Sequence, residues 1–160
     1  MGLYVDLHGH SSKPGVFVYG VEAKQWREWY AGHPKNPPPP HSELIFPSLL
    51  QERCNLFDLE ACEYKLRPSK YGTGRAVFWR HFGIEHSFTI ECSFGGAARG
   101  PCAGLHFDVH HLRNIGRDMC LAVWDMLGDE QEQNAKRILA AGQVLSLLAF
   151  LVTKSTNPDT

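Results

Sequence analysis

The stretch Leu3–Ser11 reads LYVDLHGHS, a run of β-forming residues followed by an acid, two histidines and a serine. A buried strand that ends at a polar site has this pattern. If the strand continues, Asp6, His8 and His10 share one face, because side chains alternate along a strand. Neutral imidazole is a good ligand for zinc, and Asp6 could bind a metal or orient a histidine. The stretch therefore indicates a strand that carries a metal or catalytic site.

The composition excludes several classes of protein. The 160 residues suit one domain or part of a larger one, and 43% hydrophobic and 21% charged residues are typical of a globular protein. Lys and Arg (16) nearly balance Asp and Glu (17), so no overall field favours nucleic acid or an acidic membrane. Five cysteines without a C-x-x-C pair indicate a reduced protein. Because no signal peptide or spanning helix is recognisable, we expect a cytoplasmic protein.

The remaining periodicities predict an α/β domain in which strands precede long helices. The predicted strands are Val16–Tyr19, 60–66, 75–80 and 86–94, and the predicted helices are 22–30 (one or two turns), 44–53, Asp108 to about Leu127, and Glu130 to about Val152. The helix from Asp108 carries an apolar stripe, and Gly116 inside it suggests close packing. The stripe consists of Leu112, Ile115, Met119, Val123 and Met126. A proline-rich surface loop is expected at about 31–42, an additional helix at 129–152, and a flexible tail at 153–160.

Four further residues are candidates for chemistry. Glu91 lies in the predicted strand SFTIECSF, where alternation places it on one face with Thr89 and Ser93. That face is either exposed sheet surface or a cleft in which Glu91 acts as a general base. Arg75 and Arg80 bracket the preceding predicted strand, as ordinary edge charges or as a guanidinium grip on a carboxylate. Tyr71, in the turn before them, could bring a phenol hydroxyl to the site.

Several motifs then follow one another in a specific order. DLHGHS is followed by VFVYG, by TGRAVFWR-x-x-GI-x-x-SFTIECSF and by G-x-HF-x(4)-L-x-x-IG-x(3)-C. In this succession, over roughly residues 4–127, the chain resembles the cytosolic carboxypeptidases, the tubulin-deglutamylating branch of the zinc metallocarboxypeptidases. The resemblance implies a mixed β-sheet with flanking helices, with residues 1–128 as the C-terminal half of the catalytic domain.

The resemblance also implies roles for individual residues. His8 falls on a zinc ligand, and Glu91 on the catalytic glutamate that activates water and protonates the leaving amine. Arg75 falls on a basic position suited to a glutamate substrate, and His10 becomes a neighbour that lines the site. The implied reaction removes glutamates from the C-termini or side chains of proteins such as tubulin, with one Zn²⁺ per complete domain.

One departure from the family pattern limits these implications. The resemblance places two further zinc ligands in a His-x-x-Glu motif upstream of DLHGHS, but no histidine of this chain has a glutamate three residues later. A catalytic zinc needs three protein ligands and an open position. We therefore expect an incomplete site in this chain, with activity only when the missing N-terminal half of the catalytic domain is present.

Two alternatives remain open. The chain could be a truncated pseudo-enzyme that binds acidic tails through Arg75 without catalysis, and such binding would weaken with salt. It could also be a metal-dependent hydrolase of the amidohydrolase type, in which His8 and His10 both coordinate and further ligands come from residues such as His106, His110 or His111. Substitution of His10 would abolish metal binding only in this second case.

Overall fold

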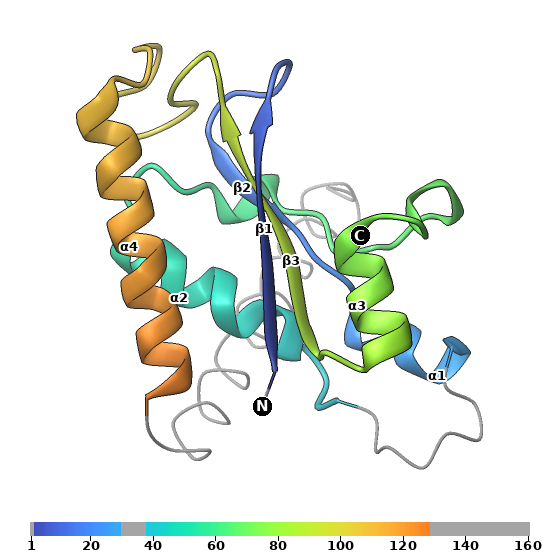
Figure 1. The fold of residues 1–160 in the computed structure, drawn as a ribbon. Coiled ribbons are helices and arrows are strands. Elements are labelled where there is room, and N and C mark those ends of the chain that lie inside the picture. The colour runs from blue at the N-terminus through green and yellow to red at the C-terminus, as the bar shows by residue number, and fades with distance from the viewer. Residues whose placement is uncertain (1, 30–37, 129–160) are drawn as a thin grey trace, which may run out of the picture.

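The computed structural model describes residues 2–29 and 38–128 of the chain. Figure 1 shows a small sheet with helices on both sides. The strands are β1 (Leu3–His10), β2 (Val16–Tyr19) and β3 (His86–Ser93). The α-helices are α1 (Trp26–Trp29), α2 (Ile45–Arg53), α3 (Gly74–Phe82) and α4 (Val109–Leu127). Short 3-10 helices lie at Ala23–Gln25, Ser42–Leu44, Leu59–Ala61 and Pro68–Lys70.

The sheet has the strand order β1-β3-β2, so its central strand is the last one in the chain. β1 runs parallel to β3, with residues 3–10 paired one to one with residues 86–93. β2 runs antiparallel along the other side of β3. The sheet is therefore mixed, which confirms the predicted fold class. The parallel pairing joins two segments that are far apart in sequence.

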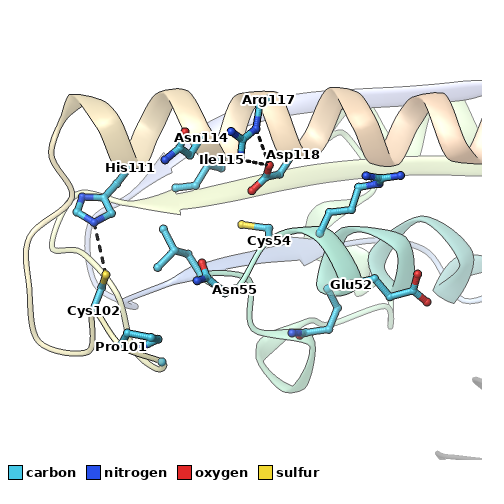
Figure 2. Close-up of a pocket in the computed structure, with 14 residues that line it drawn as sticks. Glu52, Cys54, Asn55, Pro101, Cys102, His111, Asn114, Ile115, Arg117 and Asp118 are labelled. Atoms are coloured by element: carbon cyan, nitrogen blue, oxygen red, sulfur yellow. Dashed lines mark hydrogen bonds and ion pairs between the residues drawn. The ribbon is translucent and has the colours of Figure 1, made fainter.

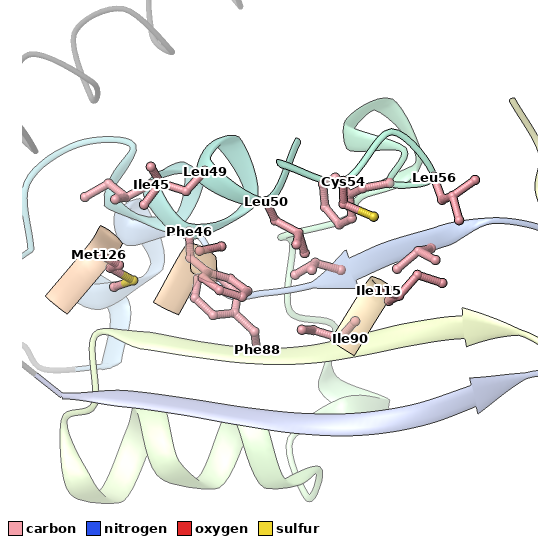
Figure 3. Packing of buried hydrophobic residues seen from close by; sticks show 14 of the residues in the cluster. Ile45, Phe46, Leu49, Leu50, Cys54, Leu56, Phe88, Ile90, Ile115 and Met126 are labelled. Carbon is pink, nitrogen blue, oxygen red and sulfur yellow. The ribbon is translucent and has the colours of Figure 1, made fainter. Parts of the chain in front are cut away.

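One face of the sheet packs against α2 and α4 and forms the core. Figure 3 shows Phe88 and Ile90 of β3 below Phe46 of α2, with Ile115 of α4 in the same layer. The rings of Phe46 and Phe88 have centroids 5.3 Å apart. Complete burial of one such side chain contributes about 1.5–3 kcal/mol of stability. This layer therefore supplies much of the free energy that holds β3 in place.

Helix α3 lies on the opposite face of the sheet. The ring of Phe78 stacks on Tyr4 of β1 with a centroid distance of 4.1 Å, and the Ser87 hydroxyl donates a 2.8 Å hydrogen bond to the backbone carbonyl of Arg75. The close approach depends on Gly74, because a Cβ built there would lie 2.3 Å from the Tyr4 hydroxyl oxygen. The first two turns of the helix are therefore anchored to both β1 and β3.

The helix α3 corrects the strand predicted at 75–80. Its buried residues are Arg75, Ala76 and Trp79, which follow the spacing of one helical face. A short apolar run does not by itself distinguish a buried strand from a buried helix. The helix ends at Gly83, which adopts a left-handed conformation with φ of 63° that favours glycine.

A second correction concerns residues 60–66, which were predicted as a strand. Leu59–Ala61 instead forms a 3-10 helix, capped by the Asp58 side chain, which accepts the Ala61 N–H. An isolated bridge then joins Glu63 to Tyr19 at the end of β2. The cap explains why the segment is not a strand. An aspartate that accepts a hydrogen bond from the backbone N–H three residues later favours a turn over pairing in a β-sheet.

The predicted helix after Asp108 is confirmed, but its buried face differs in detail. Asp108 caps α4, and Ile115 and Met126 are buried as expected. Leu112 is 48% exposed, whereas the charged Asp118 is buried on the core side. Gly116 does not mark close packing, since a Cβ there would meet no described atom within 4 Å.

The other sequence predictions divide into two groups. The strands at 16–19 and 86–94 and the helix at 44–53 are confirmed as β2, β3 and α2. The additional helix at 129–152, the tail at 153–160 and most of the loop at 31–42 lie outside the described residues.

Two further observations bear on the class of protein. Among the helices that the structure describes, none is long and apolar enough to cross a membrane. All five cysteines lie within the described residues and are free thiols.

Candidate active site on the polar face of the sheet

The predicted site residues of β1 and β3 lie on the same face of the sheet. In the parallel ladder, Asp6 pairs with Thr89, His8 with Glu91 and His10 with Ser93. Paired residues project to the same side, so the alternation predicted for both strands is confirmed. The strand β2 adds its own alternate residues to this side. The polar face, as we call it, consists of Asp6, His8, His10, Phe17, Tyr19, Thr89, Glu91 and Ser93.

His8 is the most accessible of these candidates. Its side chain is 53% exposed, and its Nε2 lies 2.9 Å from Oδ2 of Asp6. A carboxylate that holds one ring nitrogen fixes the orientation and tautomer of the imidazole. The other nitrogen, Nδ1, then remains for a ligand. Of the two roles considered for Asp6, the geometry fits that of orienting His8.

His10 lies at the end of β1 in a more constrained setting. Its Nδ1 accepts the backbone N–H of Lys13 at 2.9 Å, and its ring meets Phe17 edge-on with a centroid distance of 5.1 Å. The Lys13 ammonium lies 4.3 Å from the centre of the same Phe17 ring. His10 therefore helps to close one end of the polar face.

Glu91 is a buried carboxylate at the centre of this face, with only 8% of the residue exposed. It pairs with His8 on one side and with Phe17 on the other. Its negative charge acts on Tyr19, whose pKa is raised first by burial and then by the charge of Glu91. The Tyr19 hydroxyl consequently keeps its proton at neutral pH and can donate a hydrogen bond.

Arg75 reaches the polar face from α3 and is itself buried. Its Nη1 donates to the Thr89 hydroxyl at 3.4 Å, and its guanidinium carbon lies 5.3 Å from the centre of the Tyr19 ring. Burial lowers the pKa of Arg75, and the charges of Tyr19 and Glu91 oppose that shift. Its buried Nε has no hydrogen-bond partner among the described residues. An unsatisfied buried donor is costly, so this atom is suited to an incoming acceptor.

Arg80 and Tyr71 lie elsewhere. The Arg80 guanidinium stacks over Trp29 at 3.7 Å from the ring centre and lies 4.9 Å from that of Tyr71. Tyr71 and Trp29 also meet edge-on, at the border of a second hydrophobic cluster around Trp26 and Trp79. Since α3 is a helix, Arg75 and Arg80 point in different directions. The structure thus brings Arg75 to the polar face and places Arg80 and Tyr71 in an aromatic cluster.

Sequence reasoning missed Tyr19, which contacts Arg75 and feels the charge of Glu91. The β-forming run VFVY predicts a strand that puts Phe17 and Tyr19 on one face and Val16 and Val18 on the other. This pattern could not be used without knowing that β2 pairs with β3.

The described residues do not by themselves form a metal site. They contain no group of three or more His, Cys, Asp or Glu side chains placed to hold a metal ion. His8, oriented by Asp6, is chemically suited to serve as one ligand. A complete site requires donors from outside the described residues.

Comparison with solved structures defines the fold. The metallo-carboxypeptidase of Burkholderia cenocepacia matches 79% of this chain and 30% of its own, with a TM-score of 0.60 and 17% identity. The enzyme from Pseudomonas aeruginosa, solved in complex with (2-guanidinoethylmercapto)succinic acid, matches 76% of this chain and 31% of its own, with a TM-score of 0.55 and 23% identity. The fold is therefore that of part of a metallo-carboxypeptidase domain.

Relatives in sequence identify the branch of the carboxypeptidase family. Mouse cytosolic carboxypeptidase 2 is 33% identical over 130 residues, and mouse cytosolic carboxypeptidase 3 is 37% identical over 124 residues. These matches cover 81% and 77% of this chain. No protein-family model matches. The chain belongs to the metallocarboxypeptidase family, in its cytosolic carboxypeptidase branch.

The matched region is a small part of the relatives. The chain spans 14% of the mouse cytosolic carboxypeptidase 2 and 12% of the mouse cytosolic carboxypeptidase 3. Family membership also argues against the amidohydrolase-type alternative, in which both His8 and His10 would coordinate.

Proposed function

We propose that the protein contributes the C-terminal half of a zinc-dependent carboxypeptidase site that removes glutamates from the C-termini or side chains of proteins such as tubulin. The observation that carries this proposal is the pairing of His8 with Glu91 on the polar face, next to Arg75. The residues proposed as ligand, base and carboxylate-binding group thus lie on one face of the sheet in a member of this family. We further propose that the protein acts in the cytoplasm, as the names of its relatives suggest.

His8 would hold the metal together with two ligands that the family resemblance assigns to an N-terminal half of the catalytic domain. Asp6 supports this role because it engages Nε2 and leaves Nδ1 for coordination. When bound, zinc supplies a Lewis acid that polarises a peptide carbonyl and makes water more acidic. The edge position of β1 in the described sheet leaves room for that half to continue the sheet beside it.

Glu91 would accept a proton from the attacking water at its carboxylate and pass it to the leaving amine. Its place beside His8 and Phe17 in the sheet puts the carboxylate on the same face as the proposed metal ligand. The neighbouring Tyr19 hydroxyl keeps its proton and can donate to an oxygen of the substrate.

Arg75 would bind a carboxylate of the glutamate substrate. Its guanidinium can make two parallel hydrogen bonds to a carboxylate, and its Nε lacks a partner among the described residues. Such a contact would favour acidic residues over neutral ones of the same size.

The test uses the natural full-length protein that contains this chain. Release of glutamate from a peptide with a polyglutamate terminus should fall by about 10²-fold or more in Glu91→Gln, because the base is lost. Arg75→Lys keeps the charge but loses the planar fork, so KM should rise more than kcat falls. Glu52→Gln, at an exposed position of α2, is the matched control and should behave like the wild type. Unchanged glutamate release in Glu91→Gln would refute the assignment of the base.

The non-catalytic alternative has its own support, since no histidine of the chain has a glutamate three residues later. The intact mass of the protein from its own cell distinguishes the peptidase from the non-catalytic binding protein. A mass well above 18.0 kDa, with a His-x-x-Glu segment in the extra part, would favour the peptidase. A mass of 18.0 kDa would favour a binding protein, whose affinity for polyglutamate should depend on Arg75 and weaken with salt.

A further inference from the structure

A pocket of about 630 Å³ lies on the core side of the sheet, away from the polar face (Figure 2). It is bounded by the C-terminal end of α2, the loop that follows β3, and the first turns of α4. Its lining includes Cys102 and His111, together with the amides of Asn55 and Asn114. None of these residues takes part in the proposed peptidase chemistry.

Two side chains that line this pocket, Cys102 and His111, lie next to a third, Asp108. The Cys102 Sγ lies 3.5 Å from Nε2 of His111, as the dashed line in Figure 2 marks. The other ring nitrogen of His111, Nδ1, lies 2.7 Å from Oδ1 of Asp108. A thiol next to an imidazole that a carboxylate orients is the arrangement of an activated cysteine nucleophile.

The backbone fixes the sulfur at this place. The Leu105 N–H donates to the Cys102 carbonyl at 2.9 Å, and the Gly104 N–H donates to the Ala97 carbonyl at 3.1 Å. Gly96, with φ of 108°, lets the loop close, because a Cβ there would lie 1.9 Å from the Leu105 carbonyl oxygen. Cys102 is thus held in a hydrogen-bonded loop against the start of α4.

The capping of α4 fixes the imidazole. The Asp108 side chain accepts the His111 backbone N–H at 2.8 Å, and this bond is the first cause that lowers the pKa of the Asp108 carboxyl. The carboxylate is therefore ionised at neutral pH. The Asp108 backbone N–H also points at Nδ1, but at 3.3 Å. Because the carboxylate contact is shorter and charge-assisted, we assign the proton to Nδ1, which leaves Nε2 free to accept a proton.

We propose that Cys102 is a reactive thiol and a site of covalent modification by small uncharged Michael acceptors, with His111 as its base and Asp108 as the group that positions His111. The Cys102 thiol gives its proton to Nε2 of His111 while the sulfur forms a bond to the β-carbon of the acceptor. The carbon–carbon double bond opens to an enolate, which then takes the proton from the imidazolium at its α-carbon. All atoms of both reactants remain in the adduct, and no oxidant or leaving group is needed.

The pocket favours an uncharged, carbonyl-containing reactant. Asn55 and Asn114 offer amide N–H groups that can bond a carbonyl oxygen, whereas the Arg117 guanidinium is bound to the Asp118 carboxylate at 2.8 Å. The Arg53 guanidinium, which also lines the pocket, is paired with the Asp125 carboxylate. The proposal does not rest on the peptidase function, because the pocket and the polar face lie on opposite sides of the sheet.

The experiment treats the 160-residue chain with acrylamide at pH 7 and follows each cysteine by peptide mass spectrometry. Cys120, an exposed free thiol on α4, is the internal reference. We expect Cys102 to react at least about tenfold faster than Cys120, although it is less exposed, because base assistance is typically worth this much or more.

Variants identify the cause of the reactivity. In His111→Gln, the rate at Cys102 should fall to that of Cys120 or below. Asp108→Asn keeps a good helix cap but loses the carboxylate, so it should lower the Cys102 rate several-fold while the helix content is unchanged. His110→Gln, at the exposed neighbouring position, is the matched control and should have no effect. The proposal is overturned if Cys102 reacts no faster than Cys120 in the wild type, or if neither His111→Gln nor Asp108→Asn slows it.

Discussion

The two faces of strand β3 are built from alternate residues of one short segment, yet they have different partners. Phe88 and Ile90 are almost fully buried against α2 and α4 (Figure 3). Thr89 and Glu91 are also buried, but against Arg75 and Tyr19, which are polar. Buried charges and hydroxyls contribute little net stability, whereas buried rings contribute much. The apolar face therefore stabilises the strand. Because it does so, the polar face can carry groups suited to chemistry.

The largest effect on stability is expected for Phe88→Ala, which tests whether the apolar face stabilises β3. Loss of the ring from a site that is 1% exposed should lower the free energy of unfolding by about 3–5 kcal/mol, because it leaves a cavity beside Phe46. Urea denaturation measures the change. Leu7→Ala on the edge strand, where the residue is 62% exposed, is the control and should cost about 0.5 kcal/mol or less. Equal effects of the two substitutions would contradict the division.

His86, a titratable residue on the apolar face, allows a second test, which is the pH dependence of stability. His86 is buried, and burial lowers its pKa to about 4, from 6.5. The unfolded chain therefore binds a proton between pH 6.5 and 4 while the folded chain does not, so stability falls as the pH decreases through this range. The loss amounts to about 3 kcal/mol.

The His86→Gln variant isolates this contribution from other groups. The adjacent Glu85 has a pKa raised by burial, which works in the opposite direction as the pH decreases. We therefore expect the difference in unfolding free energy between wild type and His86→Gln to change by about 3 kcal/mol from pH 7 to pH 4. A constant difference across this range would show that the pKa of His86 is the same in the folded and the unfolded protein.

A smaller and favourable effect is expected at Gly116 of α4. A Cβ at this position would meet no described atom within 4 Å, so Gly116→Ala adds no clash. Alanine also favours the helix by up to about 1 kcal/mol relative to glycine. Thermal denaturation should show a higher Tm for this variant. A lower Tm would indicate that α4 packs against another surface at this point.

The smallest effect on stability is expected at His8 of the polar face. Its side chain is 53% exposed, and its contact with Asp6 is an exposed ion pair when the imidazole is charged. Such pairs contribute little, so His8→Ala should change the unfolding free energy by less than about 0.5 kcal/mol. The same substitution in the full-length protein should strongly reduce zinc content, as measured by elemental analysis. A large loss of stability would mean that His8 has a structural role.

Much of the fold could be predicted from local patterns. Runs of β-forming residues identified β1, β2 and β3, and alternation placed Asp6 with His8, and Thr89 with Glu91. Asp108 and the apolar period identified α4. The pattern failed at α3, because its short apolar run fits either a strand or a helix, and the choice depends on how Tyr4 and Ser87 contact it.

The sequence by itself determined which residues of each strand share a face, because that property depends only on the period of two along the chain. It also determined the family, through motifs that follow one another in order. Only the tertiary structure decided that His8 meets Glu91, since register between distant parallel strands depends on packing against α2 and α4. The tertiary structure also brought Arg75 and Tyr19 to the polar face and turned Arg80 away from it. These outcomes depend on contacts between segments far apart in sequence, which no local pattern contains.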